Sequence, residues 1–182
     1  MTKYLRIAFI LIYLSTLPLW VRGQDIFDTK NAEIVLKVRH HGVVSDIWSN
    51  QLHILLDLSN ANFSSYLEKG SIQTRDDLLL KDLESLPQRI ELNGNFGTVE
   101  IQTTTHVPLI FPLVGKLSVG STIIPVNGMA KLQHIDGGDI ACLLSFEFTL
   151  SKEVLPLDMV KRHRVEEIEI RVLQSILNPR LN

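Results

Sequence analysis

The chain has 182 residues, 45% of them hydrophobic, a formal net charge of −2 and a single cysteine. A chain that is not basic lacks the composition of a typical nucleic-acid-binding protein. One cysteine excludes an intramolecular disulfide, so packing and strand pairing must supply the stability. Cys142 lies in an apolar run, and we interpret it as a small buried hydrophobe rather than a reactive thiol.

Residues 1–23 are predicted to be a secretory signal peptide that is removed on export. Lys3 and Arg6 precede an uncharged, largely apolar run over residues 7–20. This run is short for a bilayer span. A buried N-terminal helix is the alternative, but the basic start and the polar chain from Gln24 onward favour a signal peptide.

The mature chain, residues 24–182, is expected to be one soluble domain without a membrane span or a nucleic-acid partner. The signal peptide carries three of the 18 basic residues and no acid, so 15 basic residues remain against 20 acidic ones and the mature charge is −5. Gln24 stands where a bacterial lipoprotein would carry its lipidated cysteine. We therefore expect a freely diffusing protein that is periplasmic or secreted.

Alternation of apolar and polar residues predicts strands along most of the mature chain. In the clearest case, residues 140–150, apolar side chains at even positions alternate with Ser145, Glu147 and Thr149. Turn sequences rich in Gly, Asn and Asp separate the strands. This regular spacing predicts an all-β fold, an antiparallel sandwich or barrel. The predicted strands are residues 32–39, 51–58, 88–94, 98–104, 109–119, 122–133, 140–150 and 165–173.

Residues 74–86 break this pattern and predict one short α-helix. The Thr74 hydroxyl can cap a free amide, and Asp76 and Asp77 would lie at the positive end of the helix dipole. Leucines then recur at helical spacing until Pro87 ends the helix. A helix with one apolar side must cover something, and in a small barrel we expect it to cover an open end or a gap.

The sequence shows no motif for catalysis, a cofactor or a metal. His40 and His41 are adjacent and would face opposite ways on a strand, and the other four histidines lack a second ligand at short spacing. We interpret all six as surface or loop histidines. No nucleophile elbow, phosphate-binding loop or dinucleotide fingerprint occurs. We therefore expect a protein that is not an enzyme, and a hydrolase assembled from scattered histidines and acids is the remote alternative.

Large aliphatic side chains are the feature in excess. A closed sheet of about eight strands is either filled by its own side chains or able to hold one slender ligand. Strand parity selects the residues expected to line such a cavity, and a register error of one residue would move them all to the other face. The candidates are Leu52, Ile54, Leu56, Leu113, Leu117, Leu144, Phe146 and Phe148.

Three stretches resemble the YceI-like family of exported bacterial lipid-binding proteins. Residues 72–80 (IQTRDDLLL) are similar to the threonine and Arg-Asp-x-x-Leu stretch that begins the family's short helix. Residues 86–92 (LPQRIEL) resemble its proline followed by a strand, and residues 114–126 resemble its Gly-x-Leu-Thr-x-x-Gly hairpin. The resemblance covers residues 71–150 and implies a lipocalin-like antiparallel β-barrel. It also implies a long apolar cavity for a polyisoprenoid or other lipid chain, in the periplasm of a Gram-negative cell.

The leading hypothesis is thus an exported, non-enzymatic carrier whose partner is an apolar lipid or polyisoprenoid ligand. The alternative is an interaction module of the cell envelope, with a filled barrel whose strand edges or loops, such as residues 60–70, bind another protein. The oligomeric state is left open between a monomer and a homodimer.

Overall fold

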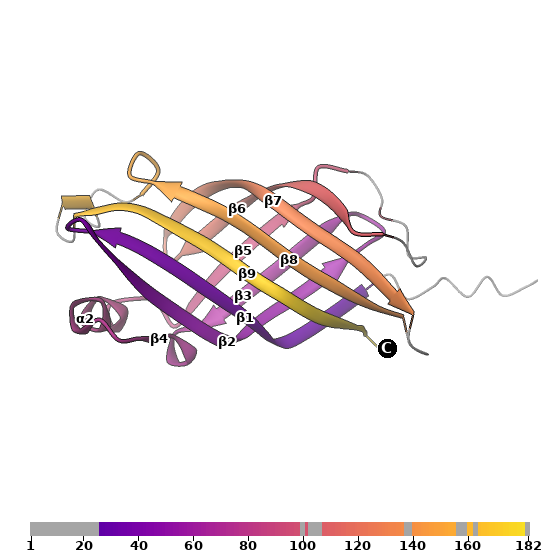
Figure 1. The fold of residues 1–182 in the computed structure, drawn as a ribbon, viewed down its shortest axis with the longest axis horizontal. Helices are drawn as coiled ribbons and strands as arrows, with labels where there is room; N and C mark the ends of the chain where they lie inside the picture. Colours follow the sequence, from indigo (N-terminus) through magenta and orange to yellow (C-terminus); the bar gives the residue numbers. More distant parts are fainter. Residues whose placement is uncertain are drawn as a thin grey trace, which may run out of the picture.

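The structure, a computed structural model, describes residues 26–98, 101, 107–136, 140–155, 160–161 and 164–180. Within these residues, eight long antiparallel strands close into a barrel (Figure 1). The predicted signal peptide, residues 1–23, lies outside the described residues and stays a prediction. The barrel strands are β1 (Ile26–His40), β2 (Val43–Asp57), β3 (Asn62–Glu68), β5 (Arg89–Asn95), β6 (Leu109–Val119), β7 (Thr122–Asp136), β8 (Ile140–Ser151) and β9 (Val165–Pro179).

The chain runs around the barrel as a meander. Each of the eight strands pairs with the next along the chain, and β1 pairs with β9 to close the ring. Each barrel strand therefore has a paired neighbour on both sides, over part or all of its length. A short strand, β4 (Gln73–Thr74), pairs with β2 outside the ring. The all-β antiparallel barrel with a short helix, predicted from the sequence, is confirmed.

The predicted strands match the observed ones in place, and several are too short. The prediction begins β1 six residues late at residue 32 and ends β9 six residues early at residue 173. The strand predicted over residues 98–104 falls mainly outside the described residues. Its two described members, Thr98 and Ile101, are not in a strand.

The interpretation of residues 60–70 as an exposed strand edge or loop is wrong, because Asn62–Glu68 forms β3, whose two edges pair with β2 and β5. Its inner face carries the buried side chains of Phe63, Ser65 and Leu67. The polar Ser65 interrupts the apolar alternation that marks the other strands. Inside the barrel it is accommodated because its hydroxyl donates to the carbonyl oxygen of Leu92, 3.3 Å away.

One half of the barrel interior is tightly packed. This half lies towards the end where β1 begins and β9 ends (Figure 1). Phe96 and Ile101 fold over that end, with their amides bonded to the carbonyl oxygens of Ala61 and Leu58. Six leucines of this half have no solvent exposure, which is typical of a close-packed core. They are Leu56, Leu58, Leu113, Leu132, Leu144 and Leu177.

The opposite end of the barrel is covered by the helix α2 (Asp77–Glu84) (Figure 1). Its N-terminal cap is Asp76, whose Oδ1 accepts hydrogen bonds from the amides of Leu78 (2.9 Å) and Leu79 (3.2 Å). The predicted cap, Thr74, is two residues too early. Held in β4, it donates to the carbonyl oxygen of Asp46 and accepts from the Asp76 amide. Val160 and Lys161 also have helical conformation.

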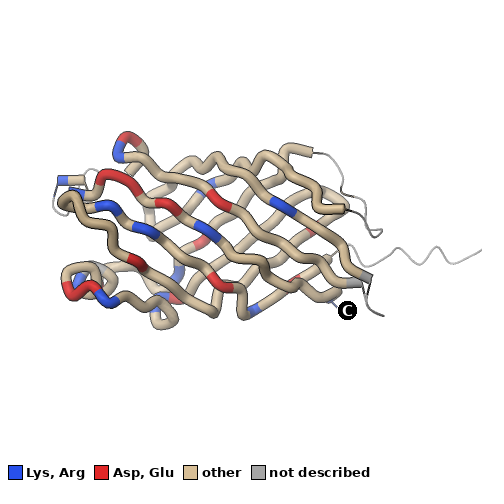
Figure 2. The backbone as a smooth tube through the Cα atoms, in the orientation of Figure 1, with Lys and Arg blue, Asp and Glu red and all other residues tan. Residues whose placement is uncertain are grey.

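Lys and Arg positions are interspersed with Asp and Glu positions along the barrel strands (Figure 2). Arg39 on β1 and Glu167 on the neighbouring β9 are 3.9 Å apart. Arg89 on β5 donates to Glu68 on β3 at 2.8 Å. Such exposed cross-strand pairs add little stability, but they place charged, well-hydrated groups on the outer face of the sheet. Every helix in the described ranges is too short or too polar to cross a bilayer.

Candidate ligand cavity

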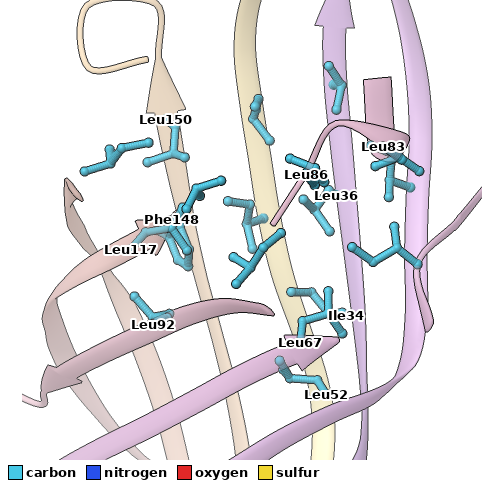
Figure 3. A pocket seen from close by; sticks show the side chains of 18 of the residues that line it. Ile34, Leu36, Leu52, Leu67, Leu83, Leu86, Leu92, Leu117, Phe148 and Leu150 are labelled. Atoms are coloured by element: carbon cyan, nitrogen blue, oxygen red, sulfur yellow. The ribbon is translucent and has the colours of Figure 1, made fainter. Parts of the chain in front are cut away.

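An internal cavity of about 260 Å³ occupies the half of the barrel next to α2 (Figure 3). All eight barrel strands contribute side chains to its wall, and α2 and the segment after it contribute to its roof. The same strands whose side chains fill the packed half thus surround an unfilled space in this half. The lining side chains labelled in Figure 3 are Ile34, Leu36, Leu52, Leu67, Leu83, Leu86, Leu92, Leu117, Phe148 and Leu150.

The wall of this cavity is apolar, and the part of it that the structure describes carries no Lys, Arg, Asp, Glu or His. Its hydroxyl groups belong to Ser65, Tyr66, Ser85 and Thr122. The Ser65 hydroxyl already donates to a backbone carbonyl within the wall. A cavity of this kind offers little to a charged or strongly polar molecule, whose buried groups would lose their hydrogen bonds to water. It favours an apolar chain.

The roof of the cavity is built by the apolar side of α2. Leu79 and Leu83, four residues apart on the helix, face the cavity and Leu79 is buried. Leu78 and Leu80 point away from it and are 64% and 49% exposed. The helix prediction that apolar leucines would cover an open end of the barrel is confirmed for Leu79 and Leu83.

A polar cluster joins this roof to the barrel rim. Ser45 on β2 donates to Asp76 Oδ2 at 2.5 Å, and His40 Nε2 on β1 lies 3.2 Å from the same oxygen. His40 Nε2 is also 3.0 Å from the Ser45 hydroxyl. The pKa of Asp76 is lowered, mainly by the Ser45 hydrogen bond and further by the Leu79 and Leu78 amides and by His40. Asp76 therefore both caps α2 and ties it to the β1–β2 hairpin.

The floor of the cavity is an aromatic cluster. Phe146 lines the cavity. The ring of Phe63 lies on the side of the packed half, with its centroid 5.6 Å from that of the Phe146 ring. Phe63 in turn stacks on Phe96 with ring centroids 5.1 Å apart. Gly94 faces Phe63 in the neighbouring strand, and a Cβ at Gly94 would come within 2.9 Å of the Phe63 ring. The missing side chain of Gly94 thus makes room for the ring that closes the floor.

The eight side chains predicted to line a cavity all lie inside the barrel, but the cavity reaches only four of them. Seven are buried and Leu117 is half-buried against the core. Leu52, Leu117, Phe146 and Phe148 line the cavity. The other four, Ile54, Leu56, Leu113 and Leu144, fill the packed half of the barrel. Contact of any of them with a ligand stays a prediction.

The sequence candidates omitted lining residues on β1 and β9. Ile34, Leu36 and Val38 come from β1, and Ile168 and Ile170 from β9. The period-two alternation of both strands was visible in the sequence and marked these residues as one face. The missing information was position along the barrel axis, because alternation tells the inner face from the outer one and does not tell a packed level from a hollow one.

The interpretation of the histidines as surface residues is wrong at two positions. His40 is 5% exposed within the polar cluster, and His134 has no exposure and lies edge-on to Phe27. His41 is exposed, and His53 stacks on Tyr66 with ring centroids 4.3 Å apart. His106 and His163 lie outside the described residues. Among the described residues, no three His, Cys, Asp or Glu side chains come together as a metal site would require.

Cys142 is buried, as its place in an apolar run predicts. Burial raises the pKa of its thiol to about 12. The thiolate is therefore scarce at neutral pH, and the side chain serves as a small hydrophobe in the packed half.

A second hollow of about 400 Å³ lies against the wall formed by β6, β7, β8 and β9. Its lining includes the charged side chains of Lys131, Glu147 and Arg171, which belong to the outer face. It offers a mixed, partly charged surface. The internal cavity is the better ligand site because its wall is apolar and is built from all eight barrel strands.

Comparison with known proteins supports the fold. No protein-family profile matches the chain, and no curated protein sequence matches it. A solved structure described as a polyisoprenoid binding domain from Saccharophagus degradans, implicated in plant cell wall breakdown, is similar in fold, with a TM-score of 0.62. The likeness covers 85% of this chain and 97% of that one, at 6% sequence identity. At this identity the comparison shows a shared barrel architecture.

Proposed function

We propose that this chain is an exported, non-enzymatic carrier of an apolar lipid or isoprenoid chain, similar to the YceI-like proteins. The observation that carries the proposal is the internal cavity, whose described wall is built mainly from aliphatic and aromatic side chains and includes no charged one. The fold shared with a polyisoprenoid binding domain supports it. The predicted signal peptide, residues 1–23, supports a periplasmic or secreted location, and the resemblance to the YceI-like family adds that the cell is Gram-negative.

The binding energy in such a carrier comes from removing the tail from water. Each buried methylene contributes about 0.8 kcal/mol, so a tail of about ten methylenes gives roughly 8 kcal/mol before the costs of immobilisation. No directed polar contact is needed for this. Discrimination between ligands then depends on the length and width of the tail, because the wall of the cavity is uniform in chemistry.

The filled-barrel alternative accounts for one half of the molecule only. The packed half fits it, but the α2 half retains a cavity of about 260 Å³. The segment proposed as a binding loop is strand β3, whose edges pair with β2 and β5. A protein whose task was to present its outer surface would gain stability by filling this space.

The proposal is tested by native mass spectrometry of protein purified without detergent, followed by organic extraction and lipid analysis. We expect a stoichiometric apolar adduct, or its uptake when isoprenoid alcohols or fatty alcohols are added. Leu117→Trp, which fills the cavity from β6, should abolish the adduct. Ile123→Trp, on the outer face of β7 at 64% exposure, is the matched control and should retain it. A ligand-free mass with no uptake contradicts the proposal.

A further inference from the structure

The barrel is hollow over part of its length only, and this limits what it can hold. The aromatic floor of Phe146, Phe63 and Phe96 separates the cavity from a half in which leucines have no solvent exposure. Close-packed interiors of this kind do not admit extra atoms without displacing side chains. A tail that enters beneath α2 must therefore stop at this floor.

The strands give the depth of the cavity. On β8 its lining runs from Phe146 to Leu150, and on β9 from Val165 to Val172. At about 3.3 Å per residue and a strand tilt of about 40°, these stretches span about 10 Å and about 18 Å along the barrel axis. An extended chain advances about 1.25 Å per bond, about a third of the distance between consecutive Cα atoms in the protein backbone. The cavity thus accommodates about eight to fourteen carbons in a line.

We propose that the ligand is a single-chain lipid with a short tail of about eight to fourteen carbons, or about two to three isoprene units, and a head that stays at the α2 end. This inference rests on the proposed carrier function and adds the tail length to it. It distinguishes this chain from a carrier that threads a long polyisoprenoid through the whole barrel, which the packed half does not permit.

Two basic side chains near the α2 end, Lys69 and Arg89, are engaged with groups of the protein itself. The Lys69 ammonium donates to the carbonyl oxygen of Glu84 at 3.2 Å. The Arg89 guanidinium pairs with Glu68 and lies over the Tyr66 ring, 4.1 Å from its centroid. The nearby lining residues Ser85 and Thr122 carry neutral hydroxyls. Uncharged alcohols are therefore suitable probes of the tail length.

The test is a displacement titration with alcohols of increasing length, using a neutral naphthylamine fluorophore as the displaced probe. The linear series is octanol, decanol, dodecanol, hexadecanol and eicosanol, and the prenol series is geraniol, farnesol, geranylgeraniol and solanesol. We expect affinity to rise about fourfold per methylene up to dodecanol. Beyond about fourteen carbons affinity should stop rising. Solanesol should not displace the probe.

Two variants move the floor in opposite directions. Phe63→Val removes the ring and should extend the rising part of the series to hexadecanol, whereas Leu52→Phe fills empty space above the floor and should end the rise at octanol or decanol. Leu113→Val, in the packed half below the floor, is the control and should leave the limit unchanged. Because Leu52→Phe adds atoms to a cavity, it tests the proposal even if Phe63→Val fails to fold.

The limit on tail length and the carrier function are contradicted by different results. The length limit is overturned if affinity keeps rising through eicosanol, or if the wild-type protein binds solanesol as tightly as farnesol. Either result leaves the carrier function standing. Displacement by no alcohol in either series contradicts the carrier function itself. A limit that shifts equally in Leu113→Val and Leu52→Phe also overturns the assignment of the floor.

Discussion

Asp76 is the residue on which the cover of the cavity depends. Its two carboxylate oxygens act separately: Oδ1 caps α2 through the Leu78 and Leu79 amides, and Oδ2 accepts from Ser45 beside His40. Both sets of contacts favour the ionised carboxylate, and the pKa of Asp76 is accordingly lowered. One side chain thus holds the helix both in shape and in place.

Replacing Asp76 with alanine should lower the free energy of unfolding by about 1 to 2 kcal/mol, because the cap and the link to the rim are lost together. Urea denaturation at neutral pH measures this difference. The matched control is Asp77→Ala at the exposed first residue of α2, which should cost less than about 0.5 kcal/mol. Equal losses for the two variants would contradict the role given to Asp76.

The same contribution should depend on pH in one direction. The folded-state pKa of Asp76 lies below its ordinary value of 3.8, so the stabilisation is fully present above that value and is lost as the pH falls through the folded-state pKa. The stability difference between wild type and Asp76→Ala should therefore be constant near neutral pH and shrink in acid. A difference that grows on acidification would contradict this assignment.

Cys142 should behave as an inert core residue. With its thiol pKa raised to about 12 by burial, the folded protein should react with a disulfide reagent far more slowly at pH 8 than the protein unfolded in urea. The released chromophore reports the rate directly. Reaction of the folded protein at the rate of a free thiol would place Cys142 at an exposed position and contradict the packed half.

At the scale of single elements, β6 passes from the packed half to the hollow one. Leu113 has no solvent exposure, and Leu117, four residues further along the same face of the strand, lines the cavity. Leu113→Ala should cost about 2 to 5 kcal/mol of unfolding free energy, because it leaves a void in a packed region. Leu117→Ala enlarges a space that already exists and should cost less than half as much. Urea denaturation of both variants provides the comparison, and equal losses would contradict the two-part interior.

The helix α2 is expected to control access to the cavity. Leu79→Ala removes part of the roof and should speed the release of a bound alcohol several-fold, as measured by stopped-flow displacement of the fluorophore. Leu78→Ala, on the exposed side of the same helix, is the control. Unchanged release from Leu79→Ala would show that ligands enter elsewhere.

The strands show what the sequence could and could not provide. The alternation in residues 140–150 marked the inner face of β8, because each inward side chain there is apolar. β3 was not predicted because the polar Ser65 at an inward position breaks the apolar alternation. Its hydrogen bond to the Leu92 carbonyl oxygen on the neighbouring strand cannot be predicted from local residues. The cap of α2 was placed at Thr74 because β4, which engages that residue, depends on a pairing with distant β2.

Tertiary contacts also explain why only four of the eight side chains predicted to line the cavity do so. Leu144 and Phe148 are alike in the sequence, both apolar and both at inward positions of one strand. Leu144 is packed and Phe148 lines the cavity because of the side chains that reach them from other strands and from α2. Parity gives the inner face of a barrel, whereas the division into packed and hollow levels is set by tertiary contacts.

At the scale of the whole molecule, stability and function are assigned to different ends of one barrel. The end where β1 begins and β9 ends is packed by leucines and phenylalanines, and the α2 end keeps its space (Figure 1). Closure by the β1–β9 pairing lets the packed half hold the ring together while the hollow half stays open. This division supports the proposed carrier with a short tail site.

The most direct test of this account is methyl NMR of the leucine-labelled protein during titration with dodecanol. We expect shift changes confined to cavity leucines such as Leu36, Leu117 and Leu150, with no change at Leu56, Leu113 and Leu132 of the packed half. Absence of any change, or changes centred on the packed half or on exposed residues of the outer wall, would contradict the claim that the α2 half of the barrel is the lipid site.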